Sequence, residues 1–282
     1  MSTALFLSPH LDDVAFSCGG TLARLKARGW TVALVTVFTR SVPHPSGFAL
    51  ACQTDKGLPP DVDYMEMRRE EDRDFAELME VDVLVWTNLP EAPHRGYDSA
   101  PALFTPPRED DRIGTAVVKR LAPLLAELQP DLVLAPQALG SHVDHVQVAR
   151  LMPSLGAWDS RTLWYRDTPY AVRQPGARPD PALPSDLRPL VVDVSAELPR
   201  KVTGCTCYRT QVGFQFGGAQ AVGPTLTAFH QREAAAHGRT GHAEVFLAGA
   251  DFDPGLREAL TEQVPNSAIR RPARGLLRSH PV

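Results

Sequence analysis

The sequence lacks the features that mark several large classes of protein. It contains no block of Lys and Arg, and its formal net charge of −4 gives no basic surplus for binding a phosphate backbone. No run of about 18 apolar residues could cross a membrane, and the N-terminus lacks the charged, apolar and small-residue phases of a signal peptide. We therefore expect a cytoplasmic protein that binds neither nucleic acid nor membrane.

Cysteine is scarce as well. The four residues Cys18, Cys52, Cys205 and Cys207 do not have the Cys-x-x-Cys spacing of a zinc ribbon. Four thiols in a chain of 282 residues are also too few for a disulfide framework. We expect them to be reduced and mainly to fill space in the core.

The apolar runs alternate with helical patterns, which predicts an α/β fold. Apolar residues over 4–8 and β-branched residues over 31–38 indicate two strands, with helix-like spacing between them that ends at Gly29. A strand, a helix and a strand within about 35 residues form a βαβ unit, which predicts a parallel sheet. Further strands are predicted over 83–86 and 132–135.

The length and the 43% hydrophobic content permit one large core. We expect a single domain over 1–265, made of a core over 1–152 and a C-terminal elaboration over 153–265. The arginine-rich tail over 266–282 is expected to be disordered.

Two clusters of metal-binding side chains each follow a predicted strand. The first follows the strand over 4–8, and the second comes shortly after the strand over 132–135. Their members are His10, Asp12, Asp13, His142, Asp144 and His145. The carboxyl ends of parallel strands meet at one rim of a sheet, where ligands bind. This placement predicts a divalent-metal site.

The spacing of the two clusters also indicates which of their six side chains would bind the metal. A catalytic zinc ion usually takes three protein ligands and leaves one position for water. His10 and Asp13 lie in one tight loop and His145 arrives from the other cluster, which gives two histidines and one carboxylate. The alternative is that the acidic loop only caps the following helix and that the histidines are surface groups. The presence of both clusters, each after a strand, favours the metal site.

Three members of the clusters are then free for catalysis. Asp12 is predicted to take the proton of a metal-bound water, and His142 to supply the acid or the donor for the oxyanion. Asp144 is predicted to orient His142 or His145.

A long segment follows the second predicted strand. Residues 39–60 contain Pro43, Pro45, Pro59 and Pro60, which predicts a loop of about 20 residues. Because this loop leaves the rim end of the strand, it is placed to cover a pocket.

The two clusters resemble the signature of the PIG-L and LmbE-like family of zinc-dependent N-acetylglucosaminyl deacetylases. That signature is Pro-His-x-Asp-Asp shortly before Gly-Gly-Thr, followed by a distal His-x-Asp-His, and it is found here at 9–13, 19–21 and 142–145. The resemblance spans roughly residues 3–250. Its weaker parts are Arg68-x-x-Glu71, Tyr208-x-x-Gln211 and Glu244-Val245-Phe246.

The resemblance implies a Rossmann-like parallel sheet with helices on both faces and removal of acetyl from a small-molecule amino sugar conjugate. Carried over by position, it assigns zinc to His10, Asp13 and His145, and it makes Arg68 a substrate-binding residue. Another divalent metal such as Fe²⁺ remains open. Family members assemble variously, so a homo-oligomer also remains open.

One departure from the family's pattern concerns the group that would stabilise the oxyanion of the reaction. Some family members have a tyrosine two positions before the first distal histidine, and this chain has Gly140 there. Stabilisation of the oxyanion is then expected from zinc and His142, or from a group on a mobile loop.

Three other functions compete with deacetylation on this fold. A nucleotide-binding protein of this fold needs Gly-x-Gly-x-x-Gly at the first strand-to-helix turn, where this chain has carboxylates at 12–13. A zinc hydrolase of another small amide and a non-catalytic sugar-binding protein on the same scaffold both remain open.

Overall fold

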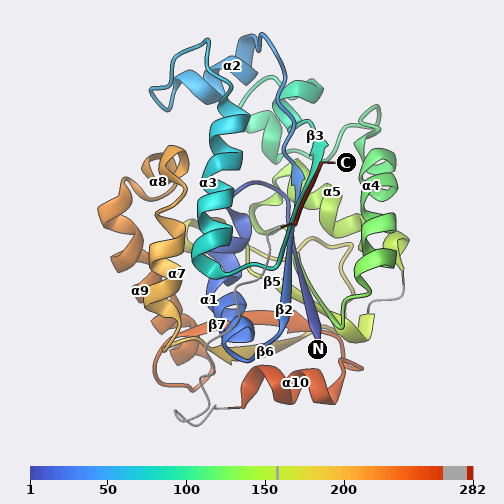
Figure 1. Ribbon diagram of the computed structural model, residues 1–282, viewed down its shortest axis with the longest axis vertical. Helices are drawn as coiled ribbons and strands as arrows, with labels where there is room; N and C mark the ends of the chain where they lie inside the picture. The colour runs from blue at the N-terminus through green and yellow to red at the C-terminus, as the bar shows by residue number, and fades with distance from the viewer. Residues whose placement is uncertain (157–158, 263–277, 282) are drawn as a thin grey trace.

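The computed structural model describes residues 1–156, 159–262 and 278–281, which form an eight-stranded sheet flanked by helices (Figure 1). The strands are β1 (Thr3–Ser8), β2 (Thr31–Phe38), β3 (Val83–Leu89), β4 (Leu132–Pro136), β5 (Thr162–Tyr165), β6 (Arg188–Asp193), β7 (Ala243–Ala248) and β8 (Arg278–Pro281). Their order in the sheet is β6-β7-β5-β4-β1-β2-β3-β8. Only β7 runs antiparallel to its neighbours, so the sheet is mostly parallel, as predicted.

Helices cover both faces of this sheet. The longer ones in the described residues are α1 (Asp13–Ala27), α2 (Gly47–Thr54), α3 (Tyr64–Met79), α4 (Ile113–Leu128), α5 (Val143–Leu151), α7 (Leu198–Cys205), α8 (Arg209–Phe216), α9 (Ala219–Ala236) and α10 (Pro254–Thr261). Helices α1, α3, α7 and α9 lie on one side of the sheet, and α4 and α5 lie on the other (Figure 1). No described helix combines the length and the apolar character needed to span a membrane.

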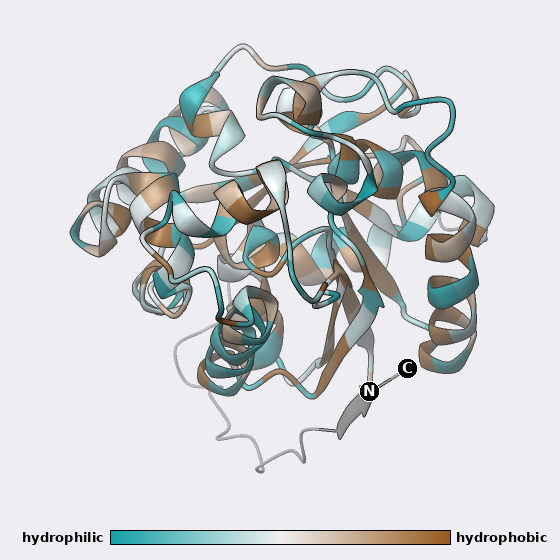
Figure 2. Ribbon diagram, turned by 90° about the horizontal axis from the view of Figure 1, so that it is seen from above, coloured by the Kyte–Doolittle hydropathy of each residue, from teal (hydrophilic) through white to brown (hydrophobic). Residues whose placement is uncertain are grey.

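Each face of the sheet has its own apolar core. Along β1, Ala4 and Phe6 pack into the core beneath α1 and α3, while Leu5 and Leu7 pack into the core beneath α4 and α5. Because a strand buried on both faces needs apolar residues at every position, the central strands are continuous hydrophobic runs. Figure 2 shows these strands between the two layers of helices.

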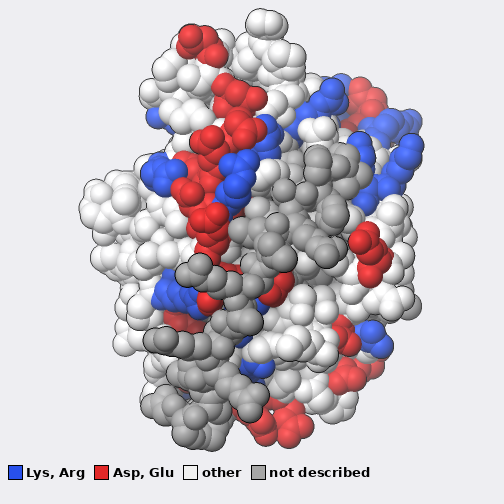
Figure 3. All heavy atoms as spheres, viewed as in Figure 1, with Lys and Arg blue, Asp and Glu red and all other residues white. Residues whose placement is uncertain are grey.

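The exposed side of α3 carries charges of both signs, which form a mixed band in Figure 3. Within it, Glu66 pairs with Arg69 and Arg73 one and two turns further along the helix. These charges form the solvated face of the helix, opposite the buried Phe75 and Met79.

The order of the strands reverses beside β1. The chain proceeds from β1 to β2 and β3 on one side, whereas β4 and β5 lie on the other side. In open parallel sheets a crevice forms at this reversal, beyond the carboxyl ends of the strands. Both predicted clusters follow the two strands that flank it, β1 and β4.

A buried ion pair holds α1 against the sheet. The helix is broken at Cys18 (φ −137°, ψ 23°), and the backbone N–H groups of Gly20 and Thr21 donate to the Glu244 carboxylate at 2.9 and 2.7 Å. Lys201 Nζ lies 2.7 Å from the same carboxylate. A Cβ at Gly20 would lie 2.9 Å from the Val194 Cβ, so only glycine permits this approach. The Gly-Gly-Thr and Glu244 parts of the sequence pattern therefore stabilise the fold.

One predicted segment differs from the structure. Residues 39–60 are not a loop throughout, because they contain α2. Beyond α7 the chain forms a second short helix, α8, before α9 begins. Glycines at 217 and 218 end α8, since both adopt positive φ.

The C-terminal part continues the same sheet through β5, β6 and β7. Most of the tail expected to be disordered lies outside the described residues. Within it, Arg278–Pro281 pair with β3 as β8, so these four residues form a strand in place of the expected disorder.

Candidate active site

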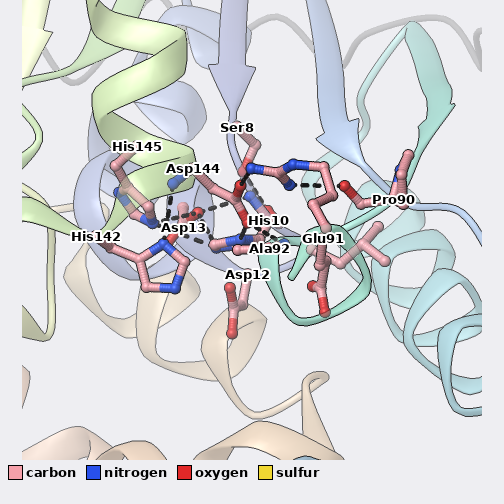
Figure 4. A network of polar contacts seen from close by, with 12 residues as sticks. Ser8, His10, Asp12, Asp13, Pro90, Glu91, Ala92, His142, Asp144 and His145 are labelled. Carbon is pink, nitrogen blue, oxygen red and sulfur yellow. Dashed lines mark hydrogen bonds and ion pairs between the residues drawn. The ribbon is translucent and has the colours of Figure 1, made fainter. Parts of the chain in front are cut away.

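The ends of β1 and β4 bring the two clusters together (Figure 4). His10 lies in the tight turn after β1, where the Asp12 N–H donates to its carbonyl at 3.0 Å, and Asp13 is the first residue of α1. His142 is the N-cap of α5, and His145 lies in the first turn of that helix. Two loops far apart in sequence therefore meet at one point.

Three donor atoms at this point form a nearly equilateral triangle. His10 Nδ1 lies 3.3 Å from His145 Nε2 and 3.5 Å from Asp13 Oδ2. His145 Nε2 lies 3.3 Å from the same Asp13 oxygen. The donors of a tetrahedral zinc ion, which bonds nitrogen and oxygen at about 2.0–2.2 Å, lie roughly 3.3–3.5 Å apart. The triangle of His10, Asp13 and His145 thus has the spacing that one metal ion requires.

Each imidazole of this triangle is fixed by a carboxylate on its other nitrogen. His10 Nε2–H donates to Asp144 Oδ2 at 2.9 Å, and His145 Nδ1–H donates to Asp167 Oδ1 at 2.6 Å. Such hydrogen bonds set the tautomer and leave the second nitrogen free to bind a metal. The Asp144 carboxylate therefore orients His10, and the backbone N–H of Asp144 is the group that contacts His142. Asp167 is absent from the sequence prediction, although it follows β5 by two residues at the same rim.

Burial and charge set the pKa values within the triangle. Burial alone would raise the pKa of Asp13, but the neighbouring imidazoles of His145 and His10 lower it to about 2. Burial lowers the pKa of His145, and the carboxylates of Asp13 and Asp167 more than compensate, so its pKa is raised. The carboxylate and the imidazoles therefore stabilise one another's charged forms.

Asp144 is itself held by the segment that follows β3. Its Oδ2 accepts the N–H of Ala92 at 3.1 Å, and its Oδ1 lies 2.8 Å from Arg95 Nη2. Arg95 pairs in turn with Asp111 at 3.1 Å. Asp144 is fully buried, so these partners replace water around its charge. No sequence pattern indicated the role of Ala92 or Arg95.

His142 lies beside the triangle with one nitrogen already used. One ring nitrogen from each of His10, His142 and His145 lies within 4.8 Å of the other two. His142 Nδ1 accepts the N–H of Asp144 at 3.2 Å, so a neutral ring carries its proton on Nε2. Burial, and then the neighbouring His10, lower the pKa of His142 well below its usual value. Of the two predicted roles, this geometry favours a neutral hydrogen-bond donor over a charged acid.

Asp12 lies beside the cluster and points away from the triangle (Figure 4). Its backbone has φ 155° and ψ −27°, a conformation that residues other than glycine seldom adopt. Burial raises the pKa of Asp12 to about 7, with a further increase from Asp13 and an opposing effect from Arg68. A carboxyl group that titrates near neutrality in a cavity is suited to accept and release a proton.

Arg68 reaches the site from α3. Its Nη2 donates to the Leu11 carbonyl at 3.2 Å and lies 3.7 Å from Asp12 Oδ1, while its Nη1 pairs with Glu91. The guanidinium thus supports the strained turn and also lines the cavity described next.

A cavity of about 350 Å³ opens over these residues. Its polar part contains His10, Asp12, Asp13, His142 and Asp144. Aromatic side chains from five separate segments form much of its wall, namely Phe48 of α2, Tyr64 of α3, Phe104, Tyr170 and Phe214 of α8. An apolar cavity with a few converging polar groups is typical of a small-molecule site. Residues 39–60 therefore line this pocket, through α2.

Tyr170 occupies the space above Gly140. A Cβ at position 140 would lie 2.9 Å from Tyr170 Cγ, and Gly140 has a φ of 81°. Tyr170 begins the short helix α6 (Tyr170–Arg173), and its ring meets that of His145 edge-on, with centroids 5.5 Å apart. A larger side chain at 140 would displace this ring.

Comparisons with known proteins identify a family and relatives of this chain. Residues 5–155 match the PIG-L family, described as GlcNAc-PI de-N-acetylase. The chain is 35% identical over 212 residues to 2'-N-acetylparomamine deacetylase of Streptomyces fradiae, a match that covers 73% of this chain and 72% of that protein.

Solved structures show the same fold. The pseudoaglycone deacetylase Dbv21 superposes with a TM-score of 0.71 at 26% identity, over 87% of this chain and 96% of that one. A deacetylase of the teicoplanin biosynthesis pathway superposes with a TM-score of 0.76 at 24% identity, over 87% of this chain and 97% of that one.

Proposed function

Because the chain belongs to the PIG-L family of de-N-acetylases, we propose that it is a metal-dependent hydrolase that removes acetyl from an N-acetylated amino sugar conjugate. The observation that carries this proposal is the triangle of His10, Asp13 and His145, with the carboxylate of Asp12 unused beside it. The names of two relatives support the substrate class, since one deacetylates 2'-N-acetylparomamine and the other a pseudoaglycone.

The donor set suits zinc, and Fe²⁺ is the alternative because two histidines and one carboxylate also bind that ion. We propose His10 Nδ1, Asp13 Oδ2 and His145 Nε2 as the ligands. When bound, such an ion lowers the pKa of a coordinated water to about 7 and polarises a carbonyl oxygen.

The chain's own residues supply the proton transfers. Asp12 accepts a proton from the water that attacks the acetamide carbon. His142 donates from Nε2 to the carbonyl oxygen as negative charge develops there, a role that a neutral imidazole can fill. When the carbon–nitrogen bond breaks, the proton on Asp12 passes to the leaving amine, and acetate is released.

The remaining groups hold this geometry and bind the substrate. Asp144 and Asp167 keep the two imidazoles in position. Arg68 fixes the turn that presents Asp12, and we propose that its guanidinium also contacts the sugar conjugate, because it lines the cavity.

The test is acetate release by the metal-loaded protein from N-acetylglucosamine, 2'-N-acetylparomamine and simple acetamides. Asp12→Asn should retain one bound ion and lose at least about 100-fold in kcat, as expected when a general base is removed. His10→Ala should lose the ion itself.

Asp186→Asn changes an exposed carboxylate outside the cavity and serves as the matched control. Its kcat should equal that of the parent. If the metal-loaded parent released acetate from none of the probes, the proposed function would be wrong. An Asp12→Asn variant as fast as the parent would refute the assignment of the base.

A further inference from the structure

One side chain of the cavity has no part in the scheme above, although it is built into the site. Tyr170 follows Asp167 by three residues, and Asp167 holds His145. The Tyr170 ring meets the rings of His145 and Phe104 edge-on, with centroids 5.5 and 5.9 Å away. The His142 ring packs against the same two rings, with centroids 5.4 and 5.5 Å away. Tyr170 and His142 therefore flank one metal-binding imidazole from neighbouring positions.

The backbone end of the Tyr170 side chain packs closely against Gly140. The ideal position of a Cβ at 140 lies 2.9, 3.0 and 3.1 Å from Tyr170 Cγ, Cδ1 and Cβ. These atoms form the backbone end of the side chain, so the hydroxyl lies at the end remote from Gly140. Tyr170 lines the same cavity as His10, Asp12 and His142.

The hydroxyl of Tyr170 is also free. The chain has five tyrosines, and four of their hydroxyls have partners: Tyr64 with Gln211, Tyr97 with Asp111, Tyr165 with the Leu7 carbonyl and Tyr208 with Asp72. In residues 1–156, 159–262 and 278–281, Tyr170 alone makes no such bond. An unpaired hydroxyl on the wall of a cavity is available to pair with a ligand.

We propose that Tyr170 is a further catalytic residue, whose hydroxyl donates a hydrogen bond to the carbonyl oxygen of the scissile amide. It would share with His142 the charge that develops on that oxygen, since both side chains flank His145. This inference rests on the proposed function, because it concerns the same reaction.

The test is Tyr170→Phe, which removes the hydroxyl and keeps the ring on Gly140. A single oxyanion donor is worth about 100- to 1,000-fold in kcat. With a second donor in place we expect a loss of roughly 10- to 100-fold in kcat, with KM, metal content and Tm close to the parental values. The defect should be smaller on the N-trifluoroacetyl analogue, whose oxyanion is less basic and needs less stabilisation.

Tyr165→Phe is the matched control, because it removes a buried hydroxyl that bonds to the Leu7 carbonyl outside the cavity. It should lower Tm and leave kcat unchanged. A parental kcat in Tyr170→Phe, a raised KM at unchanged kcat, or an equal defect on both acyl groups would each overturn the inference while leaving the proposed function intact. If the parent released no acetate from any probe, both would fail.

Discussion

At the scale of single residues, the carboxylates of Asp144 and Asp167 hold the imidazoles of His10 and His145 in position. Asp167 has its pKa raised by burial, against the effect of its hydrogen bond to His145. Asp167→Asn should weaken metal binding about 10- to 100-fold, because the His145 tautomer is no longer fixed. Competition with a chelator of known affinity measures this loss.

Asp180→Asn provides the comparison for that variant. Asp180 is also a buried carboxylate, but it pairs with Arg150 and does not contact the triangle. Its metal affinity should match that of the parent. Equal losses in the two variants would show that the Asp167 effect is general destabilisation.

The residues of the site differ in how far the sequence reveals them. His10, Asp13 and His145 could be predicted together from the sequence. The first two directly follow β1 and the third lies on the helix after β4, and the carboxyl ends of parallel strands meet at one rim. Asp167 obeys the same rule after β5 and could have been found in that way. Arg95 and Tyr170 lie in helical segments of four residues, Ala92–Arg95 and α6, which are too short to show a periodic pattern in the sequence.

At the scale of elements, α2 supplies Phe48 to the wall of the cavity. Phe48→Ala removes a ring from that wall, and burying such a ring contributes about 1.5–3 kcal/mol. We expect KM for an extended sugar conjugate to rise about tenfold, with kcat nearly unchanged and N-acetylglucosamine itself little affected. Steady-state kinetics on both substrates measure the difference.

Leu50→Ala, on the same helix but outside the cavity lining, controls for loss of α2 itself. If Phe48→Ala instead lowered kcat equally for both substrates, α2 would act on the catalytic geometry and not on the distal part of the conjugate.

Strands with a clear run of apolar and β-branched residues could be predicted from the sequence, whereas the short helix α2 could not. The strand over 31–38 has the bounds expected from its β-branched residues, and the strand expected over 132–135 extends by one residue as β4. Helix α2 has only 8 residues between prolines at 43, 45, 59 and 60. A helix of two turns shows too little periodicity to be distinguished from a loop.

At the scale of the whole molecule, a buried network ties α7 and α9 to the sheet. Lys201 Nζ donates to His230 Nε2 at 2.9 Å and pairs with Glu244, and the His230 Nδ1–H donates to the Ala243 carbonyl at 2.9 Å. Burial, and then the charge of Lys201, lower the pKa of His230 to about 3.

This network predicts a dependence of stability on pH. Below about pH 6.5 the unfolded chain binds a proton at His230 that the folded chain excludes until about pH 3. Stability is therefore not reduced by His230 above pH 6.5. Below that pH the free energy of unfolding falls by about 1.4 kcal/mol per pH unit, down to about pH 3. Urea unfolding at pH 7, 6 and 5 should show a shallower decline in His230→Gln than in the parent. Parallel declines would contradict the prediction.

The strained turn at Asp12 lowers stability but presents the carboxylate that the proposed reaction uses. With φ at 155°, glycine would adopt this backbone at less cost than any side chain. A designer who ranked substitutions at residue 12 by stability alone would choose glycine and remove the general base proposed above. Thermostability screens of this scaffold therefore need an activity filter, since selection for heat resistance would favour loss of the carboxylate.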